Sequence, residues 1–293
     1  MTGTAPEDTP AAQEAVKAAQ AAQIEERKAA ARWLDLKART LSAVVLLALG
    51  ASAIWAGGHW FAQLAVLITA LMIWELSVMT TPQIQEKGAG ARAWSLAGFA
   101  ALVLGAVLFF KHPLLLAFLP LPAIFGTLMP RRDRRIYLVY ALAIMATGFA
   151  LVGFRSEVGV RLILWIVAVV IVSDVMGYFA GRSLGGPKFW PAVSPKKTWS
   201  GTVAGWIGAI GVGLAFRFWG GGWDVVILSP FMAFAGQMGD IAESWIKRRS
   251  GVKDSSRLIP GHGGVLDRFD ALVGAAAFLL AVAALGYLPV FGG

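Results

Sequence analysis

The 293-residue sequence predicts an all-α, polytopic integral membrane protein with about nine transmembrane helices, a cytoplasmic N-terminus and an external C-terminus. Three observations support this fold class. Hydrophobic residues make up 57% of the chain and charged residues only 15%, and the mean hydropathy is +0.67; a soluble domain carries about 25% charged residues. Apolar stretches of spanning length recur along the chain. The Lys and Arg residues lie almost entirely on one side of these stretches.

The apolar stretches define the candidate membrane spans. A transmembrane helix needs about 20 predominantly apolar residues, and nine stretches meet this requirement. The candidate spans are residues 41–57, 60–79, 93–110, 112–130, 136–154, 160–181, 200–220, 224–245 and 270–290.

The basic residues indicate how these spans are oriented. With the N-terminus in the cytoplasm, 22 of the 26 Lys and Arg lie on the cytoplasmic side. This split agrees with the excess of Lys and Arg that cytoplasmic loops carry. The net charge of +9 is therefore attributed to topology, and no nucleic-acid partner is expected. The basic segments are the first 40 residues and the loops near 80–92, 131–135, 182–199 and 246–269.

Composition divides the chain into two regions. Residues 1–39 are rich in Ala, Gln and Glu and are predicted to form a cytoplasmic tail that ends in an interfacial segment. Residues 40–293 are predicted to form a membrane-embedded catalytic domain, with its site built from 173–201 and 236–270. The chain has no cysteine, which excludes disulfides, thiolate nucleophiles and Cys-based metal sites. No internal repeat is evident, which argues against an inverted-repeat transporter.

The first polar segment is SDVMGYFAGRSLGGPKFWPAVSPKKTWSG, residues 173–201. On a helix, Asp174, Gly177, Tyr178 and Gly181 share one face, because they are spaced at i, i+3, i+4 and i+7. That face can accept a ligand or another helix. A second interpretation stays equally open: the glycines only allow helices to pack closely, and the lysines of the loop only set the topology. The following residues would donate hydrogen bonds to phosphate oxygens: Arg182, Lys188, Ser194, Lys196, Lys197, Thr198 and Ser200.

The second polar segment, residues 236–270, carries five of the eleven acidic side chains of the predicted membrane domain. Asp240, Glu243, Ser244 and Lys247 fall on one helical face. Acidic residues within a spanning helix are costly and usually functional. The alternative is that acids near helix ends are only caps.

Two further aspartates, Asp267 and Asp270, lie three residues apart at the start of the last predicted span. They would share one face near the positive end of that helix. Carboxylates are the hard oxygen ligands that Mg²⁺ prefers, and Lys or Arg would neutralise the remaining phosphate charge. Phosphoryl or nucleotidyl transfer depends mainly on positioning and charge stabilisation, so these residue types are sufficient for it. The glycines of GHGG, residues 261–264, would let backbone N–H groups approach phosphates.

The run SWIKRRSGVKDSSRLIPGHGGVLDRFD, residues 244–270, resembles the signature of the phosphatidate cytidylyltransferases, also called CDP-diacylglycerol synthases. The blocks SDVMGYFAGRSLGGPK and SPKKTWSG are similar to further parts of that family, and the resemblance extends over about residues 40–290. Small departures are Val175, where the family often has Thr, and Ser256, where Gly is frequent.

The resemblance implies an enzyme, a nucleotidyltransferase of phospholipid biosynthesis. It implies that a phosphatidate oxygen attacks the α-phosphorus of CTP, releasing pyrophosphate and forming CDP-diacylglycerol. Mg²⁺ is the implied cofactor, with a second, monovalent cation left open. The implied setting is the bacterial inner membrane, with membrane lipids and a homodimeric partner.

The resemblance also implies roles for individual residues. Asp240 and Asp267 are the expected metal ligands and, with Lys247 and Lys253, the expected catalytic residues; Asp270 is a further expected metal ligand. The expected substrate-binding residues are Asp174, Tyr178, Ser194, Lys196, Lys197, Ser244, Arg248, Asp254, His262, Gly263, Gly264 and Arg268.

Two alternatives stay open at this stage. A CTP-dependent polyprenol or dolichol kinase would use similar chemistry but would release CDP instead of pyrophosphate. A secondary transporter also places acids in spans, but it is expected to have broken helices at the membrane midplane, and here the acids cluster at one face.

Overall fold

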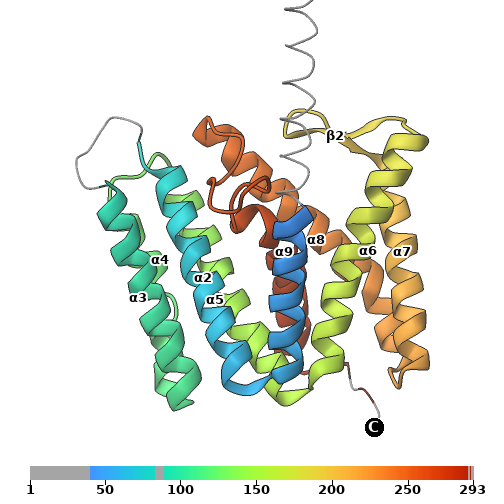
Figure 1. Ribbon diagram of the computed structural model, residues 1–293, viewed down its shortest axis with the longest axis horizontal. Helices are drawn as coiled ribbons and strands as arrows, with labels where there is room; N and C mark the ends of the chain where they lie inside the picture. Colours follow the sequence, from blue (N-terminus) through green and yellow to red (C-terminus); the bar gives the residue numbers. More distant parts are fainter. Residues whose placement is uncertain (1–39, 83–88, 290, 292–293) are drawn as a thin grey trace, which may run out of the picture.

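The computed structural model describes residues 40–82, 89–289 and 291. The predicted tail at 1–39 lies outside the described residues. The described part is a helical bundle (Figure 1). It begins with a helix at Thr40–Ala56. The long helices are α2 (Gly58–Thr80), α3 (Ala89–Phe110), α5 (Arg134–Glu157), α6 (Val160–Ser183), α7 (Trp199–Phe218), α8 (Trp223–Ser250) and α9 (Leu266–Ala284).

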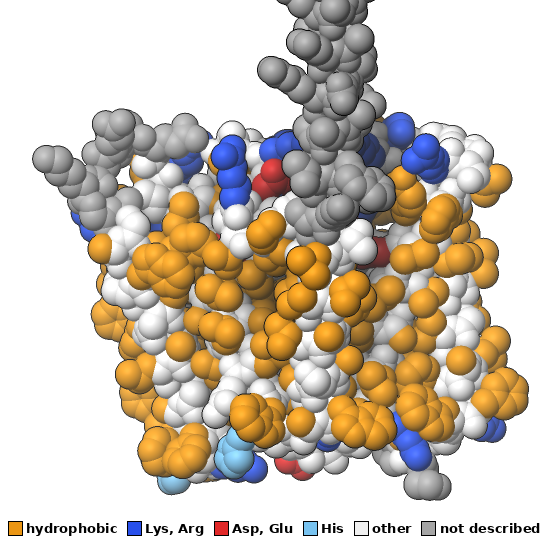
Figure 2. Space-filling model, viewed as in Figure 1, with side chains coloured by type: hydrophobic (Ala, Val, Ile, Leu, Met, Phe, Trp, Pro, Cys, Tyr) orange, Lys and Arg blue, Asp and Glu red, His pale blue; other side chains and the backbone are white. Residues whose placement is uncertain are grey.

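The predicted all-α, polytopic membrane fold is confirmed. Six of these helices, α2, α3, α5, α6, α7 and α8, are long and apolar enough to cross a membrane. Figure 2 shows hydrophobic side chains across the middle of the visible face, with most charged side chains near its two ends. The count of nine spans and the sides of the two termini stay predictions.

The predicted span at 112–130 differs from a regular helix. It consists of a short 3₁₀ helix, η2 (Pro113–Phe118), followed by α4 (Leu121–Leu128). Pro113 and Pro122 lie in the first turns of these two helices, where the missing N–H of proline is tolerated. The segment runs from the end of α3 at Phe110 to the C-terminal end of α2, where the N–H of Arg132 donates to the carbonyl of Thr80, 2.9 Å away.

The predicted loop at 182–199 contains a two-stranded antiparallel hairpin. Its strands are β1 (Lys188–Trp190) and β2 (Ser194–Thr198), with Lys188 opposite Thr198 and Trp190 opposite Ser194. The hairpin leads directly into α7, whose first turn is capped by the Thr198 hydroxyl, which accepts from the N–H of Gly201 at 3.2 Å. The lysines of this segment are therefore fixed on a strand.

Glycines allow α8 and α9 to pack with their backbones in close contact. A Cβ atom at Gly239 would lie 2.9 Å from the backbone nitrogen of Gly274, and one at Gly236 would lie 3.2 Å from the carbonyl oxygen of Ala271. Small residues at helix interfaces permit this approach in membrane proteins. The polar ends of α8 and α9 consequently lie side by side.

The predicted glycine face of α6 packs against α7. A Cβ atom at Gly177 would lie 3.2 Å from the carbonyl oxygen of Gly201, and one at Gly181 would lie 2.9 Å from Oγ1 of Thr198. The packing interpretation of these glycines is therefore correct, but the same face also lines a cavity.

Candidate active site

Three carboxylates converge where α8 and α9 are in contact. Asp240 and Glu243 come from successive turns of α8 and Asp270 comes from α9, and one oxygen of each lies within 4.8 Å of the others. The side chain of Glu243 is fully buried, and Asp270 is 8% exposed. This cluster depends on the glycine contact, since a wider separation of the helices would move Asp270 away from α8.

The carboxylate cluster has the properties of a divalent cation site. Glu243 forms an ion pair with Lys247, but neither of its carboxylate oxygens accepts a hydrogen bond within the described residues. The single ammonium of Lys247 is shared between Glu243 and Asp267, so it offsets only part of the negative charge of these carboxylates, and buried charge without full compensation is costly. The nearby oxygens are carboxylates and the hydroxyl of Ser244, which donates to Asp240 at 3.4 Å. Hard oxygen donors of this kind fit Mg²⁺.

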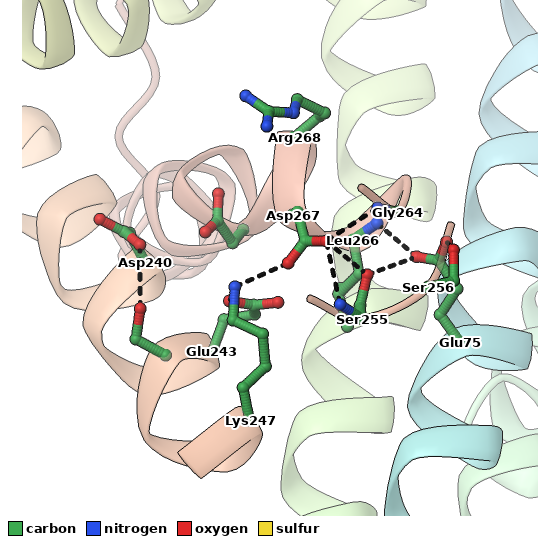
Figure 3. Close-up of polar contacts among 12 residues, drawn as sticks. Glu75, Asp240, Glu243, Lys247, Ser255, Ser256, Gly264, Leu266, Asp267 and Arg268 are labelled. Carbon is green, nitrogen blue, oxygen red and sulfur yellow. Dashed lines mark hydrogen bonds and ion pairs between the residues drawn. The ribbon is translucent and has the colours of Figure 1, made fainter. Parts of the chain in front are cut away.

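Asp267 lies beside this cluster and not among its three members. One of its oxygens is 2.6 Å from Nζ of Lys247. Its other oxygen accepts from the N–H and the hydroxyl of Ser255, both at 3.0 Å, and from the N–H of Gly264 at 2.8 Å. Lys247 therefore bridges Glu243 and Asp267 (Figure 3). Of the three predicted metal ligands, the structure groups Asp240 and Asp270, with Glu243 as the third member.

A cavity of about 540 Å³, with several charged side chains in its lining, opens next to Asp240. It lies between α6, the hairpin, α7 and α8. Five of the residues predicted for the site line it together: Asp174, Tyr178, Lys196, Lys197 and Asp240. A volume of this order is in the range of small-molecule sites. The two polar segments of the sequence thus meet in one place.

Lys197 connects the hairpin to the carboxylate cluster. Its ammonium forms an ion pair with Asp240 and donates to the carbonyl of Gln237 at 3.3 Å. The amide of Gln237 is buried, accepts from the indole N–H of Trp206 at 3.1 Å and donates to the carbonyl of Thr202 at 3.3 Å. Lys197 is therefore held in a defined position, whereas Lys196 is exposed at the edge of the cavity.

The GHGG turn packs against its own segment and against the first described helix. The hydroxyl of Ser42 lies 2.7 Å from Nδ1 of His262. Arg268 donates from Nε and Nη2 to the carbonyl of His262, at 3.1 and 2.7 Å. Gly263 has a φ of 81°, and a Cβ atom there would lie 2.7 Å from an oxygen of Asp267. Only glycine combines this backbone conformation with so close a carboxylate.

Four predicted substrate-binding or catalytic residues lie apart from these contacts. Arg248, Lys253 and Asp254 are exposed, and no side-chain hydrogen bond or ion pair joins them to other described residues. Ser194 pairs with Trp190 in the hairpin and does not line the cavity.

Glu75 was not among the predicted site residues. It comes from α2, is 0% exposed and accepts hydrogen bonds from the segment between α8 and α9. The available signal was an acid in the middle of the apolar run LMIWELSVM, residues 71–79, since acids in spanning helices are usually functional.

Comparisons with known proteins identify the family of this chain. A family model described as the cytidylyltransferase family matches residues 37–285. The chain is 36% identical over 249 residues to the phosphatidate cytidylyltransferase of Brucella abortus biovar 1, an alignment that covers 84% of this chain and 92% of the relative. It is 38% identical over 152 residues to the protein of the same name from Staphylococcus saprophyticus, which covers 48% of this chain and 58% of that one. The resemblance of residues 244–270 to this family is confirmed. Matched over most of its length, the chain belongs to the cytidylyltransferase family of enzymes.

Proposed function

We propose that this protein is a phosphatidate cytidylyltransferase, which transfers CMP from CTP to phosphatidate and forms CDP-diacylglycerol and pyrophosphate. The observation that carries the proposal is the group of three carboxylates, Asp240, Glu243 and Asp270, beside a cavity that contains Lys197. The names of the relatives from Brucella and Staphylococcus support the choice of phosphatidate.

The proposed reaction needs no strong protein base. A phosphate monoester has a second pKa of about 6, so the phosphate of phosphatidate is already largely an anionic nucleophile at neutral pH. One of its oxygens forms a bond to the α-phosphorus of CTP, and the bond from that phosphorus to the bridging oxygen of the β-phosphate breaks. The electron pair leaves with pyrophosphate. The residues of the protein need only bind, orient and neutralise the reactants.

The basic residues near the site suit this task. Lys197 reaches the cavity beside Asp240, and Lys196 and Arg182 line the same cavity. Their charge-assisted hydrogen bonds would orient the triphosphate or the lipid phosphate. Lys247 would keep Glu243 and Asp267 at a fixed separation, because it is paired with both.

Mg²⁺ belongs to the same proposal. Asp240, Glu243 and Asp270 would hold it, with Asp267 linked through Lys247 and a monovalent cation as a second ion. A bound Mg²⁺ supplies charge neutralisation for the phosphates during transfer. The unused acceptor capacity of buried Glu243 supports this assignment.

The setting proposed for the enzyme is the bacterial inner membrane, as a homodimer among membrane lipids. The apolar helices support an environment in which phosphatidate enters from the bilayer and CTP from the aqueous phase. The cavity and the carboxylate cluster lie next to each other at Asp240, where both substrates would meet.

A single assay tests the proposal. The purified protein in detergent is supplied with phosphatidate, CTP and Mg²⁺, and CDP-diacylglycerol and pyrophosphate are measured together. Equal amounts of both products are expected. Release of CDP with a polyprenol acceptor would instead identify a CTP-dependent kinase. Solute flux into sealed vesicles reconstituted with the same protein, without nucleotide consumption, would identify a transporter.

A further inference from the structure

Glu75 is a buried carboxylate that lies within hydrogen-bond distance of four donors from a distant part of the chain. Oε1 accepts from the hydroxyl of Ser256 at 2.6 Å and from the N–H of Val265 at 2.8 Å. Oε2 accepts from the N–H of Leu266 at 2.6 Å and lies 3.2 Å from the hydroxyl of Ser255, whose single O–H it shares with Asp267. Glu75 is 0% exposed, so water cannot replace any of these partners.

These contacts complete the N-terminus of α9. The first N–H groups of a helix have no partner within the helix, and the residue before it usually supplies a side-chain acceptor. The residue in that position is Val265, which has no such side chain. Glu75 supplies the acceptor from α2, and its negative charge lies at the positive end of the α9 dipole.

The same contacts connect Glu75 to the candidate active site. The hydroxyl of Ser255 lies within hydrogen-bond distance of both Glu75 and Asp267, at 3.2 and 3.0 Å. Asp267 follows directly after Leu266, and Asp270 lies one turn further along α9. Figure 3 shows Glu75, Ser255 and Asp267 next to one another in space, with Lys247 on the far side of Asp267. Whatever fixes the start of α9 therefore fixes both aspartates.

We infer that Glu75 is a positioning residue of the cytidylyl transfer, which holds the 255–266 segment and the start of α9 so that Asp267 and Asp270 lie opposite the acids of α8. The catalytic part of this inference rests on the proposed function. The structural part, that Glu75 fixes the start of α9, stands on the hydrogen bonds alone.

The substitution Glu75→Gln tests the inference because Gln has nearly the same shape. Each carboxylate oxygen of Glu75 accepts from one backbone N–H, of Val265 or of Leu266. In Gln one oxygen is replaced by an NH₂ group, which cannot accept, so one of these buried N–H groups loses its partner in either orientation of the amide.

Hydrogen exchange of the purified protein in detergent, without nucleotide or metal ion, measures the structural part. In Glu75→Gln we expect amide exchange in the 255–268 segment to be about ten-fold faster or more than in the wild type, with exchange in α6 and α7 unchanged. Thr69→Val is the matched control, since Thr69 is a buried polar residue of the same helix and no hydrogen bond joins it to the described residues of this segment. It should match the wild type in exchange and activity.

Kinetics measure the catalytic part. We expect kcat of Glu75→Gln to fall and the Mg²⁺ concentration for half-maximal activity to rise, with a smaller change in the KM for CTP. Wild-type exchange in 255–268, or wild-type kcat, would overturn the inference. Should the Gln variant not fold, Ser255→Ala decides, because it removes only the bridge between Glu75 and Asp267. That variant should show faster exchange in the same segment and a lower kcat, and wild-type values of both would overturn the inference.

These experiments can refute the proposed function and the positioning role of Glu75 independently of each other. A wild-type protein that makes no CDP-diacylglycerol would refute the proposed function but leave the exchange result intact. If the wild-type protein is active but Glu75→Gln does not change amide exchange in the 255–268 segment, only the positioning role is refuted.

Discussion

Lys196 and Lys197 are neighbours on β2, but their surroundings differ. Lys197 forms an ion pair with Asp240 and donates to the carbonyl of Gln237, whereas Lys196 is exposed at the edge of the cavity. The sequence presents the two lysines as equivalent. Alternation along the strand and the position of α8 make them unequal.

The first prediction compares these two lysines. Removing the amine of Lys197 eliminates charge-assisted contacts worth about 1.5–3 kcal/mol, so kcat/KM of Lys197→Ala should fall by roughly ten- to a hundred-fold. Lys196→Ala should lose only a few-fold, since an exposed amine contributes less. Steady-state kinetics with CTP and phosphatidate measure the effect, and thermal unfolding checks the fold. Unaltered kinetics in both variants would reduce the SPKK segment to a topology signal.

The second prediction concerns the carboxylate cluster. Asp240→Asn and Asp270→Asn keep the shape of the side chain but remove an anionic oxygen, so activity should fall by roughly a hundred-fold or more. Their effects should not add in the double variant, because both residues would act on one ion. Activity is measured at limiting Mg²⁺.

Asp224→Asn provides the control for this pair. Asp224 lies on the first turn of α8, far along the helix from Asp240, where it accepts a hydrogen bond from the hydroxyl of Tyr287 at 2.8 Å. It should retain near-wild-type activity. Near-wild-type turnover of Asp240→Asn at limiting Mg²⁺ would instead refute the metal assignment.

At the scale of elements, the α8–α9 contact determines the site. A helix presents Asp240 and Glu243 on one face, but only close packing brings Asp270 of the other helix to them. The contact consists of backbone against backbone at Gly236, Gly239 and Gly274. Spacing between these two helices should therefore control activity.

The third prediction tests this spacing with Gly239→Ala. A Cβ atom there would lie 2.9 Å from the backbone nitrogen of Gly274, so the helices must separate, at a cost of about 1–3 kcal/mol. We expect a lower unfolding temperature and a loss of activity beyond what that shift explains. Gly211→Ala on α7 is the control, since a Cβ atom there has nothing within 4 Å. It should be neutral or slightly stabilising. Equal behaviour of the two variants would contradict the role given to the contact.

At the scale of the whole molecule, side-chain contacts at the polar end join the two halves of the chain. Arg132 donates to the carbonyl of Ser250 at 3.1 Å, and Asp133 forms an ion pair with Arg249 at 3.1 Å. Arg131 donates to the carbonyl of Ser77 at 2.6 Å. The basic run at 131–135 thus has structural contacts in addition to the topological role that its charge predicts.

The fourth prediction tests the orientation in the membrane. Because the chain has no cysteine, single-cysteine variants report position without background. Arg257→Cys, in the basic segment between α8 and α9, should react with a thiol reagent only from the cytoplasmic side. Ser156→Cys, at the C-terminal end of α5, should react only from the external side. Labelling of intact and permeabilised cells with a membrane-impermeant reagent distinguishes the two. Labelling of both positions from the same side would overturn the predicted topology.

The sequence by itself determined the class of protein and the region of the site. Hydropathy marked the six helices that are long and apolar enough to cross a membrane, because a spanning segment must be apolar over a fixed length whatever its neighbours are. The run at 244–270 carried enough residues at fixed spacing to indicate the family, and acids in apolar segments marked α8 and the start of α9. These signals are local, so no packing information was needed to read them.

Tertiary structure decided which of the acids meet. The spacing on one helix put Asp267 and Asp270 on the same face, but the rotation of α9 against α8 directs Asp270 to Asp240 and Glu243. Asp267 is held by Lys247 and the Gly264 turn. Glu75 precedes its partners by more than half of the chain, so no local pattern could connect it to Leu266. Helix rotation and the distance between helices arise from packing contacts between segments far apart in sequence, and those contacts determine the geometry of the site.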